Sequence, residues 1–483
     1  MGSPLRRVTF LASCFLTLQL LSPAPPRRLA ITGANLIDVR TGRIVVNALV
    51  VIEGERIAYA GPFRSDRIPA GAKRIEAPGK TIMPGLIDMH VHLNPPEVAP
   101  LLLSAGVTTA RDLGSPAREL EALLTAIAKG RLPGPRVYAF APVSAQEHPP
   151  FAHRVSRRRE IDPLLRDLTA RHYRGVKVFD LPESLLPALV SSCRAQGLLT
   201  AAHIDRIPPR LVIESGIGTI EHIVFLASEW RPVDSRKQTA ELMRAWIDAG
   251  PSSPRFDEMI ASLKRNKTAV VPTLAALEAA LDPDRLVLNQ PGLQRLPPDL
   301  SRAVSAAAAK SPFTSGWEAE DYKSARHAFS AILSATGRLQ RERIPILAGS
   351  DNLIPGFGVH REMQLLSAAG LSNLEVLQAM TCVPGALLSP ETGLGIIETG
   401  SPADLLILAE SPLQDIRAIE TIEKVIKAGV VYDPHSLTLA ARRDVLRDVS
   451  ETEKKSTPPP AHRPGREKKS KSRTAKARKQ ELL

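Results

Sequence analysis

The segment Pro84-Gly-Leu-Ile-Asp-Met-His90-Val-His92 decides which fold this chain of 483 residues adopts. Its apolar residues lead into an alternation that places Asp88, His90 and His92 at every second position. Alternate side chains of a β-strand share one face, so these three polar groups point the same way. We interpret the segment as an apolar strand that ends in polar side chains, as strands bordering the active site of a barrel do.

Seven further apolar runs follow this one, with amphipathic stretches such as 117–129 and 183–195 between them. The eight runs are residues 81–93, 107–113, 136–143, 176–181, 198–204, 219–226, 269–274 and 344–350. Strands that alternate with helices predict a parallel sheet, and eight such units predict a (β/α)₈ barrel of the TIM type over residues 81–384. The interval 275–343 is longer than one connecting helix requires, so we expect an insertion at the catalytic face, where substrate lids are found.

Two β-rich segments flank the barrel. Residues 28–80 contain short alternating runs, and Glu53-Gly54 between two of them predicts a hairpin turn. A similar pattern returns in residues 385–435. We expect the two segments to combine into one small composite β-sandwich domain built from both ends of the chain.

Four of the later runs also contain or end in a polar residue: Lys177 in the fourth, His203 in the fifth, His222 in the sixth and Asp351 in the eighth. Barrel active sites form at the carboxyl ends of the strands, so these groups are expected to converge with His90 and His92. Imidazoles and a carboxylate are suitable ligands for zinc or a similar divalent ion. Asp88 either orients these ligands or is a hydrogen-bonded core residue, and the sequence leaves both roles open.

The two-part β domain, the Pro-Gly-Leu-Ile-Asp-Met-His-Val-His segment and the strand-end Lys, His, His and Asp resemble the amidohydrolase superfamily. Within it, they are most similar to the imidazolonepropionase-related and Xaa-Pro dipeptidase-like branch, over residues 28–435. In such enzymes the matching lysine is carbamylated by carbon dioxide and bridges two metal ions. The resemblance therefore implies two divalent ions, with zinc expected: His90, His92 and Asp351 on one, His203 and His222 on the other, and a carbamate on Lys177 between them.

The implied chemistry is the hydrolysis of an amide. An ammonium group repels metal ions, whereas a carbamate on Lys177 supplies two anionic oxygens. Metal coordination lowers the pKa of a bound water towards about 7, which produces hydroxide at neutral pH. Asp351 then serves as general base and afterwards as general acid.

The leading functional hypothesis is a hydrolase of a small-molecule amide: a small peptide, an N-acyl amino acid or a cyclic amide. An esterase or lactonase using the same site is the alternative, and a barrel that binds a ligand without catalysis is a third possibility. The third is disfavoured because none of the six matched positions is substituted.

The chain lacks the Gly-Gly-His and Ser-Gly-Gly runs common in this branch, so the resemblance gives the metal site and not the substrate. His148, His153, His360 and Arg361 could contact substrate or lie on the surface, and homo-oligomer formation stays open.

The net charge of +13 is concentrated at the carboxyl end of the chain. Residues 451–483 hold eleven Lys or Arg and four Glu, which is +7, so the other 450 residues carry only +6. This segment lacks apolar periodicity and is expected to be a disordered basic tail. It also lacks stacking aromatic residues, so we do not expect nucleic acid as a partner.

Residues 1–27 are expected to be a signal segment for export. Arg6 and Arg7 precede an apolar stretch over 8–21, and Ser-Pro-Ala-Pro-Pro follows at 22–26, an order typical of secretory signals. Leu-Ala-Ser-Cys at 11–14 also resembles a lipoprotein processing site, and a cytosolic enzyme with an apolar amino terminus is the third alternative.

If the segment is a signal, protein recovered from its native host should begin between about residues 22 and 30. Amino-terminal sequencing of the mature protein checks this. An intact amino terminus in a cytosolic fraction would contradict it.

Overall fold

The computed structural model describes residues 27–441, except 147–150, 205–206, 232–237, 352–355 and all but isolated positions of 282–315. The expected basic tail, nearly all of the expected signal segment and His148 therefore lie outside the described residues.

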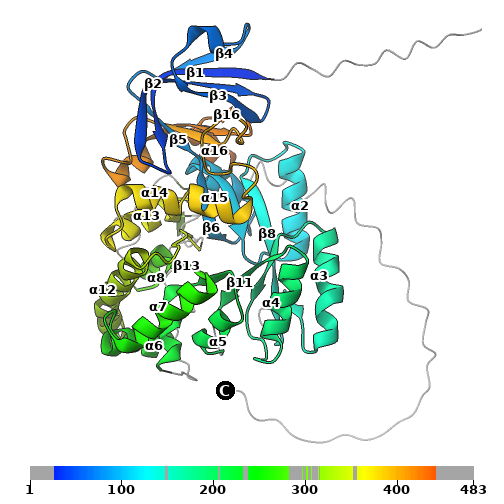
Figure 1. Ribbon diagram of the computed structural model, residues 1–483, viewed down its shortest axis with the longest axis vertical. Coiled ribbons are helices and arrows are strands. Elements are labelled where there is room, and N and C mark those ends of the chain that lie inside the picture. Colours follow the sequence, from blue (N-terminus) through cyan, green and yellow to red (C-terminus); the bar gives the residue numbers. More distant parts are fainter. Residues whose placement is uncertain are drawn as a thin grey trace, which may run out of the picture. The chain divides into compact units, whose positions relative to one another are not determined.

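A parallel barrel forms the larger part of the fold (Figure 1). In the order in which they pair, its strands are β6 (Leu86–Val91), β7 (Val107–Asp112), β8 (Arg136–Ser144), β10 (Gly175–Val178), β11 (Leu199–His203), β12 (Thr219–Glu221) and β13 (Ala269–Val271), and β9 (His153–Arg154) pairs with β8 outside the circle. The predicted eighth run completes the circle, because Leu347 N donates to Val270 O at 3.0 Å and Met89 N donates to Ala348 O at 2.9 Å. The predicted (β/α)₈ barrel is confirmed.

Helices cover the outside of this barrel (Figure 1). They are α1 (Val98–Ser104), α2 (Ala117–Ala128), α3 (Ile161–Ala170), α4 (Leu186–Ala195), α5 (Pro209–Glu214), α6 (Gln238–Ala249), α7 (Pro254–Asn266), α8 (Leu274–Leu281), α12 (Ala319–Arg341), α13 (Gly358–Ala368), α14 (Asn373–Ala379) and α15 (Cys382–Leu388). In α2 the buried residues Leu120, Leu123 and Ala126 follow the helical period, which is the pattern that predicted this helix. The helix predicted over 183–195 begins later, at Leu186.

The run predicted as one barrel strand over 81–93 is two strands. β5 (Thr81–Pro84) pairs with β1 (Arg28–Asp38) and β14 (Leu405–Leu408) in a second sheet, and the barrel begins at Leu86. Gly85 lies between the two strands, where a Cβ would come within 2.1 Å of Thr108 Oγ1. The chain passes from one sheet to the other without losing its apolar character, so hydrophobic periodicity could not reveal the break.

The run predicted over 219–226 is also shorter than expected. β12 ends at Glu221, His222 has a φ of 59°, and the 3₁₀ helix η3 (Ile223–Glu229) follows. A positive φ turns the chain away from the strand direction, and the apolar residues beyond it belong to the helix.

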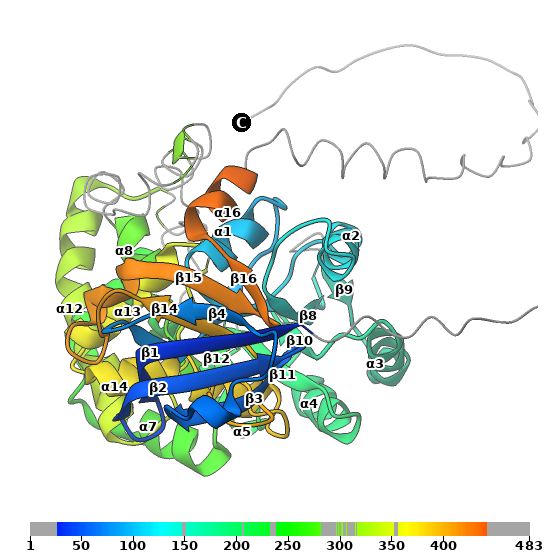
Figure 2. The ribbon, with the colours of Figure 1, turned by 90° about the horizontal axis from the view of Figure 1, so that it is seen from above.

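The second sheet is built from both ends of the described chain. Its other strands are β2 (Arg43–Glu53), β3 (Arg56–Pro62), β4 (Lys73–Glu76), β15 (Ile422–Lys427) and β16 (Val430–Tyr432). Figure 2 shows the late strands, in orange, beside the early strands, in blue. The predicted hairpin turn is confirmed, since Glu53 pairs with Arg56. All these strands belong to one sheet that branches at β1, which pairs in parallel with both β4 and β5.

The second sheet contacts the barrel at the amino ends of its strands. A Cβ on Gly106, just before β7, would lie 2.7 Å from Ile422 Cδ1 of β15. Arg136 at the start of β8 pairs with Asp404, with Nη2 and Oδ2 3.3 Å apart. The carboxyl ends of the strands, where barrel active sites form, are therefore at the opposite end.

The long insertion predicted over 275–343 contains α8 and the 23-residue helix α12. α12 packs against α6, α13 and α8 on the outside of the barrel, so this part of the insertion is not a lid. Most of the rest of the insertion lies outside the described residues. Within the part of the chain that the structure describes, no helix has the length and apolar character needed to cross a membrane.

A buried carboxyl group connects α13 to the start of α8. Glu362 on α13 is fully buried, and its Oε2 accepts a hydrogen bond from Ala275 N at 2.7 Å. Its other oxygen, Oε1, has no hydrogen-bond partner among the described residues. Burial raises the pKa of Glu362 to about 8. Hydrogen bonds from backbone N–H groups at the start of α8 lower this pKa, whereas the charges of Asp88 and Glu278 raise it.

This pKa makes the stability of the fold depend on pH. Folded Glu362 keeps its proton up to a pH of about 8, whereas the unfolded chain loses it near pH 4.5, so the free energy of unfolding falls as pH rises between these values. One pKa unit corresponds to about 1.4 kcal/mol, so we expect Glu362→Gln to be at least about 1 kcal/mol more stable than the wild type at pH 8. The difference should shrink towards pH 4.5. Urea unfolding at several pH values measures it, with exposed Glu258→Gln as the control, and equal pH slopes for wild type and Glu362→Gln would contradict it.

Candidate active site

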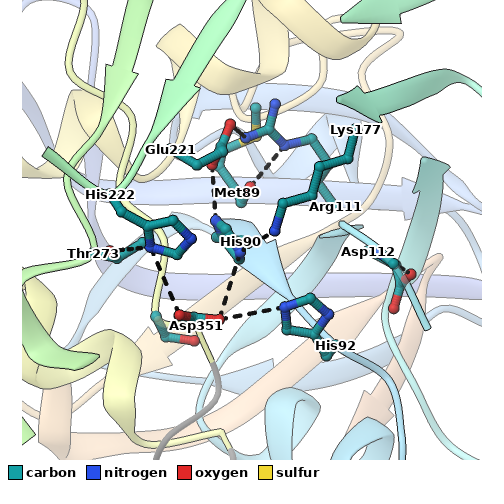
Figure 3. A network of polar contacts seen from close by, with 12 residues as sticks. Met89, His90, His92, Arg111, Asp112, Lys177, Glu221, His222, Thr273 and Asp351 are labelled. Carbon is teal, nitrogen blue, oxygen red and sulfur yellow. Dashed lines mark hydrogen bonds and ion pairs between the residues drawn. The ribbon is translucent and has the colours of Figure 1, made fainter. Parts of the chain in front are cut away.

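The six residues predicted to form the site lie at the carboxyl ends of the barrel strands, and Figure 3 labels five of them: His90, His92, Lys177, His222 and Asp351. His90 and His92 come from the end of β6, Lys177 from β10, and His203 is the last residue of β11. His222 directly follows β12, and Asp351 follows the eighth run. Each strand thus contributes its polar residue at the same end of the barrel.

Asp351 lies among three of the imidazoles. Its Oδ1 is 3.5 Å from His90 Nε2 and 3.4 Å from His92 Nε2, and its Oδ2 is 3.8 Å from His222 Nδ1. Lys177 Nζ approaches from another side, 3.1 Å from His90 Nε2. The polar atoms of five of the six predicted residues therefore surround one small volume (Figure 3).

His203, the sixth residue, lies next to His222, with their ring centroids 4.9 Å apart. Two aromatic rings flank it: Phe225 at 4.8 Å between centroids and Phe179 stacked at 5.5 Å. Phe179 also lies 5.0 Å from Lys177 Nζ. The sequence analysis did not assign these two phenylalanines to the site, and a single aromatic residue after a strand gives little signal by itself.

The ends of three strands adopt a backbone conformation that non-glycine residues rarely have. His222, Thr273 and Asp351 have φ values of 59°, 51° and 50°. Each such residue costs on the order of 1–3 kcal/mol, and such residues cluster at functional sites. The turns direct His222 and Asp351 into the site. Gly349 leaves room beside them, because a Cβ there would lie 2.6 Å from His90 Cβ.

The donor set fits a divalent metal ion. One ligand atom each from His90, His222 and Asp351 lies within 4.8 Å of the others. Ligands at about 2.1 Å from a tetrahedral zinc ion are about 3.4 Å apart, which is close to the separations around Asp351. Burial, and then neighbouring positive charge, lowers the pKa of both His90 and His222. Both rings are therefore neutral near pH 7, as ligands must be.

Hydrogen bonds at Nδ1 fix the orientation of the His222 and His90 rings. His222 Nδ1 is 2.9 Å from Thr273 Oγ1, whose hydroxyl donates to Pro272 O at 2.8 Å. The Thr273 hydroxyl already donates its hydrogen to Pro272 O, so His222 Nδ1 must be the donor to Thr273 Oγ1, and the lone pair of the neutral ring lies on Nε2. His90 Nδ1 is 2.8 Å from Glu221 Oε2 and likewise donates, which places the lone pair on its Nε2, the nitrogen that faces Asp351 and Lys177.

The surroundings of Lys177 favour the neutral form of its amine. Its side chain is 2% exposed, and burial lowers its pKa, with Arg111 adding to the effect against the nearby carboxylates. A lowered pKa increases the share of neutral amine, which is the form that reacts with carbon dioxide.

Asp88 connects the first and eighth strands of the barrel. Its Oδ1 accepts from His90 N at 3.1 Å and from Ser350 N at 3.0 Å, and its Oδ2 accepts from Ser350 Oγ at 2.6 Å. Burial raises its pKa to about 6 against these hydrogen bonds. Two roles were left open for Asp88, and these contacts support the role of orienting the ligands. The side chain is fully buried and holds the backbone segments that carry His90 and Asp351 in place.

Sequence reasoning missed a buried ion pair beneath His90. Arg111 Nη2 and Glu221 Oε1 are 2.7 Å apart, and both side chains are at most 1% exposed. Both residues are charged groups inside apolar runs, which is the signal that could have drawn attention to them. Their pairing brings together positions 110 residues apart, and no local pattern encodes it.

The other candidate residues contact the protein itself. His153 is half-buried on β9, and burial lowers its pKa. His360 is buried on α13, with its Nε2 2.8 Å from Ala105 O. Arg361 donates two hydrogen bonds to Glu278 of α8, at 2.7 and 2.6 Å. His360 and Arg361 thus connect outer elements of the barrel.

The model of the amidohydrolase family matches residues 81–432, which include the barrel strands and all six of these residues. This chain belongs to the amidohydrolase family. The match confirms the family predicted from the sequence.

Solved structures share the fold at low sequence identity. A Xaa-Pro dipeptidase with bound methionine superposes with a TM-score of 0.61 at 21% identity, over 84% of this chain and 100% of that one. Bottromycin amidohydrolase gives a TM-score of 0.67 at 21% identity, over 88% of this chain and 91% of that one.

Curated relatives match over short segments. An adenine deaminase of Mesorhizobium japonicum is 37% identical over 68 residues, 14% of this chain and 11% of the relative. A 5-methylthioadenosine/S-adenosylhomocysteine deaminase of Symbiobacterium thermophilum is 34% identical over 124 residues, 25% of this chain and 26% of the relative. An imidazolonepropionase of an Arthrobacter species is 45% identical over 51 residues, 11% of this chain and 12% of the relative. The chain thus aligns with only about a tenth to a quarter of the length of these relatives.

Proposed function

We propose that this protein is a metal-dependent hydrolase that cleaves a carbon–nitrogen bond in a small amide, such as a dipeptide, an N-acyl amino acid or a cyclic amide. The observation that carries the proposal is the convergence of three imidazoles and Lys177 around the Asp351 carboxylate. Membership of a hydrolase family supports it, as do relatives named as deaminases and a fold shared with a Xaa-Pro dipeptidase.

The residues that would hold two divalent ions, zinc in our proposal, are His90, His92 and Asp351 for one, His203 and His222 for the other, with carbamylated Lys177 between them. In forming the carbamate, the neutral amine of Lys177 attacks carbon dioxide, an N–C bond forms and one proton is released to solvent. When bound, the ions polarise a scissile carbonyl and lower the pKa of water so that it becomes a nucleophile near neutral pH.

Asp351 is suited to transfer the proton. Burial by itself would raise its pKa, but the neighbouring His90, a hydrogen bond with His92 and the charge of Lys177 hold the pKa below its ordinary value. The carboxylate is therefore ionised near pH 7. As water adds to the carbonyl carbon, Asp351 accepts the proton and returns it to the nitrogen when the C–N bond breaks, giving an acid and an amine.

Metal content tests the two-ion site. We expect purified protein to hold close to two divalent ions per chain, because six ligands exceed what one tetrahedral zinc requires. Lys177→Ala should hold fewer and lose activity. Elemental analysis gives the ratio, and a single tightly held ion unaffected by Lys177→Ala would contradict the model.

Asp351→Asn tests the proton-transfer role. The amide keeps the shape of the side chain and cannot serve as a base, so we expect a rate loss of at least about a hundredfold with near-normal thermal stability. Asp88→Asn changes only the hydrogen bonds that hold the ligands in position, so we expect it to lower the rate about ten- to a hundredfold.

The rates are measured on the substrate found in a screen of dipeptides, N-acyl amino acids, cyclic amides and lactones. Near-wild-type turnover by Asp351→Asn would show that another group carries the proton. Activity on lactones alone would favour the esterase alternative over the amide hydrolase.

A further inference from the structure

Three buried groups lie in series beneath the site (Figure 3). His90 Nδ1 is 2.8 Å from Glu221 Oε2, and the other oxygen of Glu221 is 2.7 Å from Arg111 Nη2. The exposed fractions of the three side chains are 0%, 0% and 1%. The proposed hydrolysis assigns no role of their own to Glu221 and Arg111.

The guanidinium group of Arg111 has contacts through all three of its nitrogen atoms. Its Nε donates to Met89 O at 2.7 Å, and its Nη1 donates to Thr219 Oγ1 at 2.9 Å. Its guanidinium also lies 5.2 Å from the ring centroid of Phe140. These contacts connect β7, which carries Arg111, to β6, β12 and β8, so the position of the guanidinium is fixed by four strands.

The rigid cation in turn fixes Glu221. Glu221 Oε1 accepts from both Arg111 Nη2 and Thr219 Oγ1, at 2.7 and 2.6 Å. With this oxygen occupied, Oε2 is directed at His90. A carboxylate at this position accepts a hydrogen bond, so it keeps the hydrogen of His90 on Nδ1 and the lone pair on Nε2.

The pair also balances charge. A buried guanidinium within two contacts of His90 would repel a divalent cation, and in a dry interior that repulsion is strong. The Glu221 carboxylate cancels it, so the ion pair adds no net charge beneath the site.

We infer that Glu221 is a positioning residue for His90 and that Arg111 holds Glu221 in place, so that the pair sets the metal affinity of the site. This inference rests on the proposed metal-dependent function. The competing explanation is an ion pair that only joins strands of the barrel core, and buried pairs of that kind can be replaced with little loss of stability.

Zinc affinity of the folded full-length protein separates the two explanations. The metal is removed with a chelator, and the zinc dissociation constant is measured by competition with a chromophoric chelator. Glu221→Asp keeps the charge and shortens the side chain by one methylene group, so it can pair with Arg111 or reach His90 but not both. We expect it to fold and to bind zinc about ten- to a hundredfold more weakly.

Glu221→Gln is the second variant, and it leaves the Arg111 charge uncompensated. We expect a similar or larger loss of zinc affinity together with a lower melting temperature. Asp404→Asn is the matched control, because Asp404 is a buried carboxylate paired with Arg136 at the other end of the barrel. It should lower the melting temperature and leave zinc affinity unchanged.

The outcomes are distinguishable. Folded Glu221→Asp that binds zinc as tightly as the wild type overturns the inference and leaves the proposed function standing. An equal loss of zinc affinity in Asp404→Asn also overturns it, since the effect would then come from general destabilisation. Wild-type protein that binds no zinc or other divalent ion overturns the proposed function itself.

Discussion

Closure of the barrel between its first and eighth strands determines the position of every group in the site. The closing contacts include Met89 N to Ala348 O and the hydrogen bonds of Asp88 to Ser350, which join residues 262 positions apart. Asp351 follows directly, and its own N–H donates to His90 O at 2.8 Å. A carboxylate from late in the sequence is thus fixed to the strand that carries the first two histidines. Without this closure the ligands would belong to two separate edges of an open sheet.

The site places positively and negatively charged side chains in the barrel interior, where water does not reach them. Lys177, Arg111, Glu221 and Asp88 are all buried, and each carboxylate accepts at least two hydrogen bonds. Burial therefore shifts pKa values without leaving these carboxylates unpaired. The residues that touch the central volume are three imidazoles, one amine and one carboxylate, and the Arg111–Glu221 ion pair lies behind His90.

The sequence predicted those parts of this arrangement that depend on local pattern. Apolar runs gave six of the eight strand positions to within a few residues, and a polar residue at the end of such a run gave His203, His222 and Asp351. Two kinds of feature were not predictable in this way. A change of sheet inside one apolar run, as at Gly85, leaves no mark in hydrophobicity, and a positive φ at His222 ends a strand without changing its residue types. The pairing of Arg111 with Glu221 depends on the closed barrel, which brings distant positions together only after folding.

The second sheet gives the chain a particular order of assembly. β5 is synthesised long before β14, the strand that lies beside it, because β14 is more than 300 residues later in the sequence. At about 5–20 residues per second, a ribosome needs tens of seconds to supply it. During that time one edge of β5 lacks its partner, and the strand that follows β5 opens the barrel. β14 completes the sheet on which the first barrel strand depends. Early and late parts of the sequence are therefore joined in one late, non-local step. Such a step makes folding slower than that of a chain with mainly local contacts.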